Sequence, residues 1–307
     1  MITRSLRELR ALVRRSPFKA AGRVVVITGG AGGIGSRLAE RLAAAGASIV
    51  IVDRDEQRAS AVASGLPRVG KAQHYAHVAD LTDPQNIESL MAAIDVRYGR
   101  IDVLVNNAGI AVSERFASRD VASIENEFVV NTLSPLYVTR LALDLLRSSD
   151  DPRVISTVSL SGIFPQGESV VYCGSKFGLR GAMLSLAFDL KPQGIKVSCV
   201  LPSATDTRML RREAIEGGNT LQFQNPPQTP DDVVRAMISV LDRPRLEAYP
   251  KPSESRLVRA AMIFPNLLLT LLPLFEGKGE QGQQAYLRKL IERGDVVEVD
   301  GRLELAP

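Results

Sequence analysis

Tyr172 and Lys176 stand four residues apart in the stretch VVYCGSKFG, residues 170–178. This spacing places two side chains on one face of a helix, one turn apart. An ammonium group about 4 Å from a phenol stabilises the phenolate by roughly 1 to 4 kcal/mol, so it lowers the phenol's pKa from its usual value near 10. The chain has only two histidines, so a tyrosine is a candidate for acid–base work. Ordinary surface neighbours have the same spacing, and the rest of the sequence decides between the two interpretations.

A glycine-rich stretch near the start of the chain predicts a dinucleotide site. TGGAGGIG, residues 28–35, follows an apolar, β-branched run and opens a segment with helical periodicity. The next apolar run, SIVIVD, ends at Asp53, 20 residues after Gly33. Glycines at Gly29, Gly33 and Gly35 let the backbone approach a pyrophosphate, which then rests on a helix N-terminus beside Ile34. Strand, glycine turn, helix and an acidic strand end form the context that such a site requires.

Asp53 and Arg54 bear on which dinucleotide is bound. The carboxylate of Asp53 can accept hydrogen bonds from both ribose hydroxyls and repels a 2′-phosphate, which favours NAD over NADP. Arg54 could attract that phosphate, so NADP stays possible; its alternative is a solvated surface side chain.

Apolar runs and helical segments alternate along most of the chain. Strands are predicted within residues 24–28, 48–53, 73–80, 101–106, 153–159 and 195–202, and helices at 84–98, 120–147, 172–189 and 230–242. This order predicts an α/β fold with a Rossmann-type, doubly wound parallel sheet. Ligands of such sheets bind at the carboxyl ends of the strands, where most of the polar residues named below lie.

The chain is expected to divide into three parts. Residues 1–21 form a basic head and residues 22–250 a single dinucleotide-binding catalytic domain, with an irregular substrate loop at about 203–229. Residues 251–307 form a helical, partly apolar C-terminal extension. Its uncharged stretch, 260–275, spans only about 24 Å as a helix, which is short of a bilayer core, and it contains two prolines. We expect an interfacial hairpin, an oligomer contact or a cover for the substrate cleft there.

The positive charge of the chain is concentrated at its start. Residues 1–19 hold six basic residues against one acidic residue, Glu8, whereas the whole chain has a net charge of +4. The rest is therefore slightly acidic, and a nucleic-acid surface is not expected. Apolar and basic side chains of 1–19 fall on opposite helical arcs, which suits either contact with a membrane surface or packing on the domain with solvated arginines.

Cysteine and histidine usage limits the other classes of site. Cys173 and Cys199 make no disulfide framework and suit the cytoplasm. With His74 and His77 the only histidines and no cysteine cluster, no metal site is expected. We interpret Cys173 as a small packing residue.

Taken together, the motifs resemble the short-chain dehydrogenase/reductase (SDR) family. The resemblance covers roughly residues 22–250 and rests on TGGAGGIG, on NNAG at 106–109, on Asn131, and on the spacing of Ser159, Tyr172 and Lys176. Ser159 precedes Tyr172 by the 13 residues typical of the family, which selects it over Ser161. The resemblance implies a Rossmann-type sheet, NAD(P) as cofactor and a homodimer or homotetramer.

The resemblance also assigns roles to the catalytic candidates. Tyr172 would exchange a proton with the substrate oxygen, and Ser159 would donate a hydrogen bond to that oxygen. Lys176 would lower the pKa of Tyr172 and bind the nicotinamide ribose. Asn131 would hold a water in the proton relay; a helix-kink residue is the alternative.

Further positions match the cofactor pocket of the family. Asp80, followed by Leu81, matches the acid of the adenine pocket, although Asp80 could instead cap the next helix, where Asp83 is better placed. The other matches line the adenosine ribose or hold the carboxamide: Asn107, Ala108, Gly109, Pro202 and Thr207. The chain departs from the family at Ser203, where glycine is usual, and in ISTVS at 155–159. The resemblance therefore predicts the backbone conformation of these two segments less precisely.

The sequence thus predicts an oxidoreductase that transfers a hydride between NAD(P) and an alcohol or carbonyl group. The long tail resembles that of extended family members, which suggests a lipophilic substrate such as a steroid, retinoid or long-chain alcohol. Loose membrane contact through residues 1–19 and 260–275 is a further hypothesis. The alternative is a non-catalytic dinucleotide sensor of the same fold; such relatives typically lose the tyrosine or lysine, and both are present here.

Overall fold

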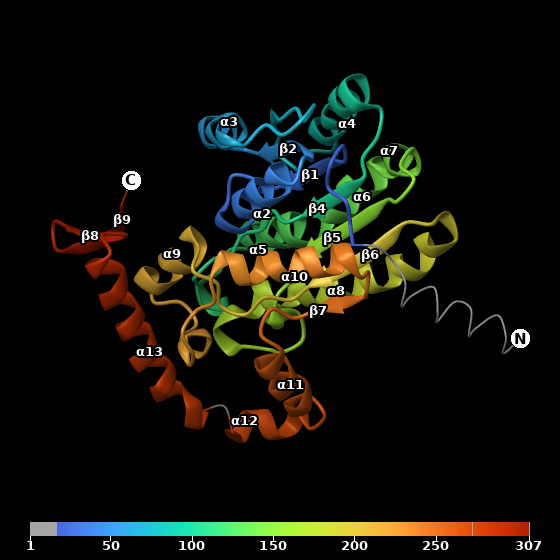
Figure 1. Ribbon diagram of the computed structural model, residues 1–307. Coiled ribbons are helices and arrows are strands. Elements are labelled where there is room, and N and C mark those ends of the chain that lie inside the picture. Colours follow the sequence, from blue (N-terminus) through green and yellow to red (C-terminus); the bar gives the residue numbers. More distant parts are fainter. Residues whose placement is uncertain (1–16, 272, 307) are drawn as a thin grey trace, which may run out of the picture.

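The computed structural model describes residues 17–271 and 273–306 (Figure 1). Most of the basic head, and with it the predicted amphipathic helix, lies outside the described residues. Residues 17–20 have no regular secondary structure, and the Phe18 amide donates to Asp242 Oδ1 at 3.0 Å.

A parallel sheet of seven strands forms the centre of the molecule (Figure 1). Its strands lie in the order β3-β2-β1-β4-β5-β6-β7. The chain builds from β1 to one edge of the sheet through β2 and β3, then crosses back to the other side of β1 and builds to the opposite edge through β4 to β7. The strands are β1 (Val24–Thr28), β2 (Ser48–Asp53), β3 (Tyr75–Val78), β4 (Val103–Asn106), β5 (Arg153–Thr157), β6 (Lys196–Val200) and β7 (Glu247–Ala248). The reversal between β1 and β4 is the point where ligands bind in such sheets. The predicted fold class is confirmed.

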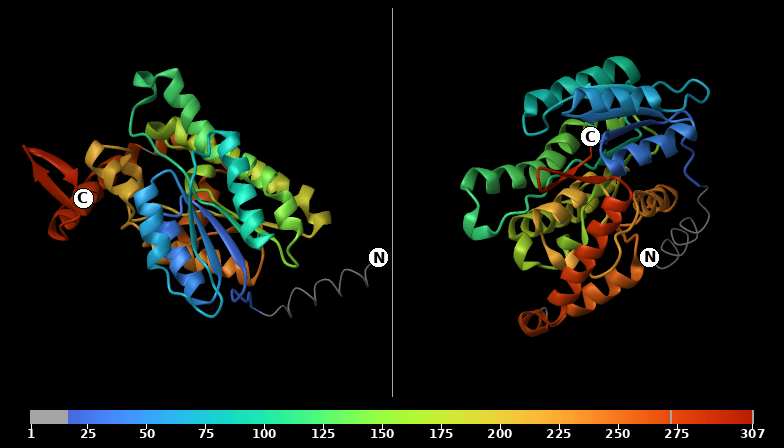
Figure 2. Two further views of the ribbon diagram at one scale, coloured as in Figure 1. Left: turned by 90° about the horizontal axis from the view of Figure 1, so that it is seen from above. Right: turned by 90° about the vertical axis from the view of Figure 1, so that its left-hand side faces the viewer.

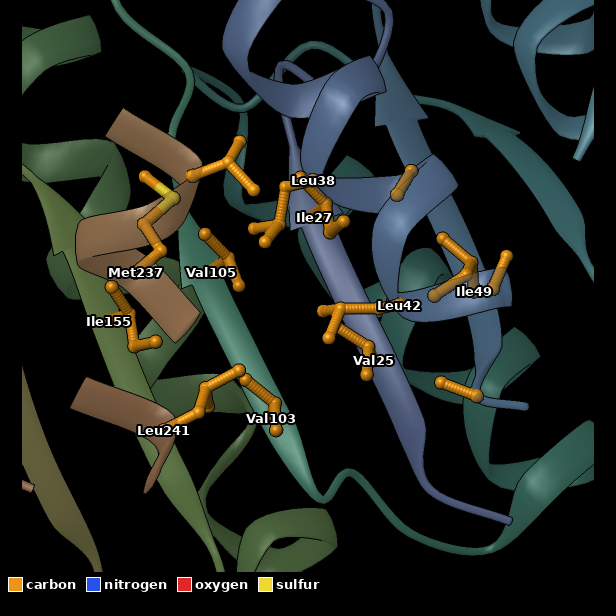
Figure 3. Close-up of a cluster of buried hydrophobic side chains, with 14 of the residues drawn as sticks. Val25, Ile27, Leu38, Leu42, Ile49, Val103, Val105, Ile155, Met237 and Leu241 are labelled. Carbon is orange, nitrogen blue, oxygen red and sulfur yellow. The ribbon is translucent and has the colours of Figure 1, made fainter. Parts of the chain in front are cut away.

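Helices cover both faces of the sheet. Successive residues of a strand point to opposite faces, and the central strands are apolar at nearly every position, so both faces have to be buried. Val25, Ile27 and Val105 pack against α2 (Gly33–Ala44) and α10 (Pro230–Asp242), as Figure 3 shows. The short helix α3 (Glu56–Gly65) covers the same face through Ala59 and Ala63. Burying a large aliphatic side chain contributes about 1.5 to 3 kcal/mol, so this packing fixes the strand ends that carry the polar residues.

The opposite face carries the helices that hold the candidate catalytic residues. Val26, Val50 and Leu104 pack there with residues of the covering helices. These helices are α4 (Pro84–Tyr98), α5 (Val121–Phe128), α6 (Ser134–Leu141), α7 (Leu143–Arg147) and α8 (Val170–Leu190). One turn of π-helix, Val129–Leu133, joins α5 to α6.

The segment between β6 and α10, residues 203–229, is called the lid, and hydrogen bonds join its two ends. The Gln228 amide donates to Ala204 O and the Asp206 amide donates to Gln228 O, both at 2.8 Å. The Gln228 side chain also donates to Ser203 O and Thr205 Oγ1 at 3.0 Å. Between these ends the chain forms α9 (Arg208–Glu216) and a short 3₁₀ helix, Thr220–Phe223.

The C-terminal extension folds back along this lid (Figure 1). It consists of α11 (Pro252–Ala261), α12 (Leu268–Leu271), α13 (Pro273–Glu292) and a hairpin of β8 (Val296–Val299) and β9 (Arg302–Leu305). Figure 2 shows the hairpin projecting from the body at the far end of α13. A small cluster that includes Leu210, Phe223, Tyr286 and Leu290 joins α13 to the lid. Gly279 and Gly282 allow the close approach, because a Cβ at Gly282 would lie 1.9 Å from Phe223 O.

Three features differ from the sequence-based expectations. The long helix expected over 120–147 is divided at the π-turn, and α3 and β7 were not predicted. The substrate loop is not wholly irregular, since α9 occupies nine of its residues. The extension is not purely helical, because it ends in a hairpin of two antiparallel strands.

Candidate active site

The glycine turn between β1 and α2 has room for backbone only. Gly29 has a φ of +59°, and a Cβ there would lie 2.8 Å from the Cα of Ala108. A Cβ at Gly35 would lie 2.5 Å from Gly29 O. The helix N-terminus that follows has no side-chain cap at Gly32 and no acidic residue in its first turn. Its amide groups are therefore available to an anionic group such as a pyrophosphate.

The ends of β1 and β4 are locked together beside this turn. Thr28 Oγ1 accepts hydrogen bonds from the amides of Asn107 (3.0 Å) and Ala108 (3.1 Å). The Asn107 side chain donates to Thr28 O and Gly29 O and accepts from Thr157 Oγ1. Asn107 thus links three strand ends and helps fix the floor of the site, where it was predicted to line the ribose.

Asp53, at the end of β2, faces the glycine turn. Its Oδ2 accepts from the Ala31 amide at 3.1 Å and its Oδ1 from the Asp55 amide at 3.3 Å. Arg58 donates to Ala31 O at 2.8 Å and so holds the same turn from outside. Arg54 is exposed, and it acts at a distance on Asp80.

Asp80 forms a local turn and caps no helix. Its Oδ1 accepts from the amide and hydroxyl of Thr82, and these bonds, ahead of the charge of Arg54, lower its pKa. Asp83 caps α4 instead, accepting from the Gln85 amide at 2.9 Å. The side chain of Asp80 is therefore exposed at the cavity rather than used by the helix.

Ser159, Tyr172 and Lys176 converge at the ends of β5 and α8. Ser159 Oγ accepts from the Ser161 amide at 3.0 Å, and Ser159 lies close enough to Tyr172 to lower the pKa of its hydroxyl. Lys176 is 4% exposed and its Nζ donates to Thr157 O at 3.1 Å. Ser161, the rival serine, points its hydroxyl at Gln166 Oε1 at 3.3 Å. Both serines line the cavity, so the choice of Ser159 stays a prediction from the spacing.

Burial dominates the electrostatics of this cluster. It raises the pKa of Tyr172, the negative charge of Glu213 adds to the rise, and the hydrogen bond with Ser159 opposes it. Burial lowers the pKa of Lys176 to about 8, against the attraction of Glu127. The expected lowering of the tyrosine pKa by lysine is thus not seen in the chain alone. Desolvation dominates the shift of the tyrosine pKa, and Lys176 Nζ lies 5.7 Å from the centre of the tyrosine ring.

Asn131 sits in the π-turn and is completely buried. Its side chain accepts from the Ile110 amide and donates to Ile110 O, both at 2.9 Å. It also donates to Ser175 Oγ at 3.1 Å. The side chain therefore ties the loop after β4 to α8, and the break in the helix at Asn131 matches the kink alternative.

One cavity of about 790 Å³ connects these elements. Ser159, Tyr172 and Lys176 line it, whereas Asn131 and Gly35 lie behind its wall. Nearly all of the predicted cofactor residues also line it: Gly29, Gly33, Ile34, Asp53, Arg54, Asp80, Leu81, Asn107, Ala108, Gly109, Pro202 and Thr207. Thr207 lies against the glycine turn, since a Cβ on Gly33 would be 3.2 Å from Thr207 Cγ2.

The rest of the cavity lining is mixed, with apolar side chains beside polar and charged ones such as Glu213, Asn219 and Lys251, and it includes the extension. Its apolar lining comes from the loop after β4, the segment after β5, the lid and α11–α12: Ile110, Val112, Leu160, Phe164, Leu210, Leu257, Val258 and Leu268. The extension therefore forms part of the wall of the cleft, one of the three roles expected for residues 260–275.

A buried ion pair behind the catalytic cluster was not predicted. Arg119 Nη2 and Glu127 Oε2 are 2.8 Å apart, with side-chain exposures of 2% and 0%. Burial raises the pKa of Glu127, and its contacts with Arg119 oppose the rise. Charged residues are rarely buried, so the sequence held no signal for this pair apart from its position one helical turn before Asn131.

Comparison with known proteins decides the family. The model of the short chain dehydrogenase family matches residues 23–216, more than half of the chain. The chain belongs to the short-chain dehydrogenases. An oxidoreductase of Staphylococcus epidermidis is 31% identical over 207 residues, which cover 67% of this chain and 88% of the relative.

Two solved structures of short-chain dehydrogenases extend the likeness to the cofactor. A 3-ketoacyl-(acyl-carrier-protein) reductase from Brucella melitensis, in complex with NADH, has a TM-score of 0.66 at 25% identity over 76% of this chain and 99% of that one. A short-chain dehydrogenase from Burkholderia cenocepacia, in complex with NADP, has a TM-score of 0.64 at 30% identity over 73% and 92%. This short-chain dehydrogenase is an NAD(P)-dependent oxidoreductase of alcohol and carbonyl groups, as the motifs predicted.

Other classes of site were sought among residues 17–271 and 273–306. No group of three or more histidine, cysteine, aspartate or glutamate side chains there could hold a metal ion. No helix of the same residues is both long and apolar enough to cross a bilayer. Cys173 and Cys199 are buried, and burial raises the pKa of both thiols.

Proposed function

We propose that this short-chain dehydrogenase reduces ketones, or oxidises the corresponding secondary alcohols, on lipophilic molecules, with Tyr172 as the proton-exchanging group. The observation that carries the proposal is the convergence of Ser159, Tyr172 and Lys176 on a cavity of about 790 Å³, to whose lining the loop after β4, the lid and the extension contribute apolar side chains. In the reductive direction the substrate carbonyl lies against Ser159 and Tyr172, and the Tyr172 hydroxyl gives its proton to the carbonyl oxygen. The raised pKa of Tyr172 suits this direction, because the phenol stays protonated at neutral pH.

The remaining roles follow from the same geometry. Reduced nicotinamide, when bound, supplies the hydride that the carbonyl carbon accepts, and the carbonyl electron pair moves to oxygen. Ser159 donates a hydrogen bond to that oxygen. Lys176, held at Thr157 O, orients the nicotinamide ribose and keeps a positive charge near Tyr172. Asn131 acts by fixing the loop after β4 against α8.

We propose NAD as the preferred cofactor. Asp53 lines the cavity with a carboxylate that the backbone of the turn holds in place at Ala31. That carboxylate accepts from ribose hydroxyls and repels a 2′-phosphate. Arg54 is exposed and offers a weaker, screened attraction to the phosphate.

A cofactor-coupled assay tests the substrate class and the cofactor together. Matched ketones of increasing apolar length are reduced with NADH or NADPH, and the absorbance of the reduced nicotinamide is followed. We expect kcat/KM to rise with apolar length and to be higher with NADH. Turnover that is indifferent to length, or a preference for NADPH, contradicts the corresponding part of the proposal.

We also propose peripheral membrane contact through the outer face of α11–α12. Ile263, Phe264 and Leu267 are 54–68% exposed, beside cavity-lining residues of the same segment. Arg256 is exposed on α11 and could meet anionic headgroups. Flotation with anionic liposomes tests this contact. We expect an Ile263→Ser/Phe264→Ser variant to lose flotation that a Val96→Ser control keeps, and absence of flotation by the unaltered protein would refute the proposal.

A homodimer or homotetramer is the proposed assembly. Phe188 is 69% exposed on α8 and Phe177 is 37% exposed on the same helix, so this helix offers apolar surface to a second copy of the chain. Light scattering should show a multiple of the 33.2 kDa chain, and Phe188→Glu should reduce it. A monomer at micromolar concentration would rule the assembly out.

A further inference from the structure

A group of polar side chains lines the cavity on the side of the lid. The group is formed by Ser113 from the loop after β4, Glu213 from α9, and Asn219 and Gln222 from the segment after α9, all of which line the cavity. Gly218 brings the two sides together, because a Cβ there would lie 3.2 Å from Ser113 Oγ and 3.3 Å from Glu213 Cβ. These four residues are called the lid subsite.

The polar atoms of the lid subsite are incompletely paired. Ser113 Oγ and Asn219 Nδ2 are buried without a hydrogen-bond partner among the described residues, and Asn219 is 4% exposed. Asn219 Oδ1 is used, accepting from the Leu221 amide at 3.0 Å, so its amide group cannot simply turn to exchange the two ends. A buried polar group without a partner costs about 1 to 3 kcal/mol, and such a cost is typical of a site that a ligand completes.

Glu213 supplies an acceptor that is held in place. Gln222 Nε2 donates to Glu213 Oε2 at 2.8 Å, and no hydrogen bond joins the other carboxylate oxygen to a described residue. Burial raises the pKa of Glu213, and the carboxyl is close enough to Tyr172 to affect the pKa of that phenol. The lid subsite therefore lies in the substrate cleft, within electrostatic reach of the reacting position.

We propose that the lid subsite binds a hydroxyl group of the substrate that is remote from the reacting carbonyl. This inference rests on the proposed function and narrows its substrate class to lipophilic ketones or alcohols that carry a second, distal hydroxyl. A hydroxyl both donates and accepts, so it can donate to Glu213 and accept from Asn219 Nδ2 or Ser113 Oγ. A distal carbonyl cannot donate to Glu213, and a distal carboxylate is repelled by it.

Matched substrates test the lid subsite directly. Saturated methyl ketones of several chain lengths are compared with their ω-hydroxy and ω-amino analogues, using NADH and the full-length protein. At the chain length that fits, we expect kcat/KM to favour the ω-hydroxy ketone by about ten- to a hundredfold, the range for a hydrogen bond to a charged group. Glu213→Leu should abolish that preference, measured as the ratio of kcat/KM for the ω-hydroxy ketone to kcat/KM for the unsubstituted ketone with the same variant, so that an effect of the lost charge on Tyr172 cancels.

Two further variants keep the test decisive. Ser113→Ala and Asn219→Leu should each reduce the preference, so the proposal can be judged even if Glu213→Leu does not fold. Glu216→Gln, on the exposed side of the same helix, should leave the preference unchanged. The NADH dissociation constant of each variant, measured by fluorescence, should match that of the unaltered protein.

The outcomes separate this inference from the proposed function. If no ketone is reduced, the proposed function fails. If the ketones are reduced but the ω-hydroxy group brings no preference at any length, or the variants leave a preference intact, the lid subsite is wrong and the function stands. Preference for the ω-amino analogue would overturn the hydroxyl assignment, because it would show that the carboxylate selects a cation.

Discussion

Two regions enclose the cavity, and they are held together in different ways. The first, called the strand-end region, is the glycine turn with the ends of β1, β4 and β5. It is fixed by close backbone contacts, such as that of Gly29 with Ala108. Thr28 Oγ1 also accepts hydrogen bonds from two backbone amides there. The second, the lid and C-terminal extension, combines a close backbone approach at Gly279 and Gly282 with side-chain contacts between distant parts of the chain. Asp206 accepts from Arg211, Tyr286 and Arg293 at 2.7–2.8 Å, next to the small apolar cluster around Phe223.

The difference indicates a division of labour. In the strand-end region, Gly29 and Gly35 leave no space for an added side chain. The same region carries the groups proposed for the chemistry. The family model ends at residue 216, so α11–α13 and the hairpin lie outside the matched residues. Side-chain ion pairs and a small cluster can be rebuilt without disturbing the sheet. We therefore expect variants of the strand-end region to affect folding and kcat, and variants of the lid and extension to affect KM and substrate choice.

The largest effect on stability is expected at Glu127, behind the catalytic cluster. Glu127→Gln leaves the Arg119 guanidinium buried without a counter-charge, which should lower the free energy of unfolding by about 3 to 5 kcal/mol. Chemical denaturation measures the loss. The control Glu125→Gln, exposed on the same helix, should change it by less than about 0.5 kcal/mol.

The same variant has a signature in the pH profile. Glu127 opposes the fall of the Lys176 pKa to about 8. Without that negative charge the ammonium should lose its proton at lower pH, so the alkaline limb of kcat should move to lower pH. An unchanged limb would indicate that Glu127 serves only stability.

Gly35→Ala should disturb the dinucleotide turn. Its methyl group would lie 2.5 Å from Gly29 O and 2.9 Å from the Cα of Gly30, so the turn has to shift. We expect a loss of about 1 to 3 kcal/mol in unfolding free energy and about a tenfold or greater loss of NADH affinity. Calorimetry and fluorescence titration measure these. Gly65→Ala, which meets nothing within 4 Å, should be neutral or slightly stabilising.

The strand-end region was also the part that the sequence predicted well. Apolar β-branched runs such as VVVIT placed the strands, and glycine, asparagine and acidic residues placed their ends. These signals are local, because a buried parallel strand must be apolar and a tight turn needs glycine. Proline and Asp83 likewise predicted the first residue of α4 correctly.

The lid and extension were predicted less well, for physical reasons. α9 has only nine residues and is soon followed by Gly217-Gly218 and Pro226-Pro227, so the sequence suggested a loop. β7 has two residues, too few for a periodic pattern, and the β8–β9 hairpin is mostly exposed. Asp206 is hydrogen-bonded to Tyr286 and Arg293, which lie 80 and 87 positions further along the chain. Only the folded structure reveals such pairs.

Asp206→Asn should loosen the extension with a smaller cost. The substitution removes the negative charge that pairs with Arg211 and Arg293, so we expect the free energy of unfolding to fall by about 1 to 3 kcal/mol. We also expect KM to rise several-fold, while kcat stays within about twofold. Limited proteolysis should cut the extension faster, whereas the exposed control Asp189→Asn should not. A fall in kcat with unchanged KM would argue against the division of labour.

The acid sensitivity of the extension follows from the same residue. Burial alone would raise the pKa of Asp206, but hydrogen bonds from Arg293, Arg211 and Tyr286 bring it below its usual value. The stabilisation is therefore present above the unfolded-state pKa, near 4, and is lost as the pH falls through the lower folded-state pKa. Proteolysis of the extension should accelerate in acid for the unaltered protein and much less for Asp206→Asn.

The smallest effect is expected at Arg54. Because this side chain is exposed, its attraction to a 2′-phosphate is screened, and Arg54→Ala should raise KM for NADPH by less than about fivefold without changing KM for NADH. The control Arg68→Ala, also exposed, should change neither. A loss of NADPH use tenfold or larger would place Arg54 in the cofactor site proper.

The most direct test of the account is the turnover of Tyr172→Phe. The substitution removes one hydroxyl from the cavity and leaves the glycine turn, Lys176 and the lid in place. We predict that kcat with NADH falls by about 10² to 10⁴-fold, while the NADH dissociation constant, measured on the same preparation, stays within about twofold. Turnover within tenfold of the unaltered protein would contradict the assignment of the proton transfer to Tyr172.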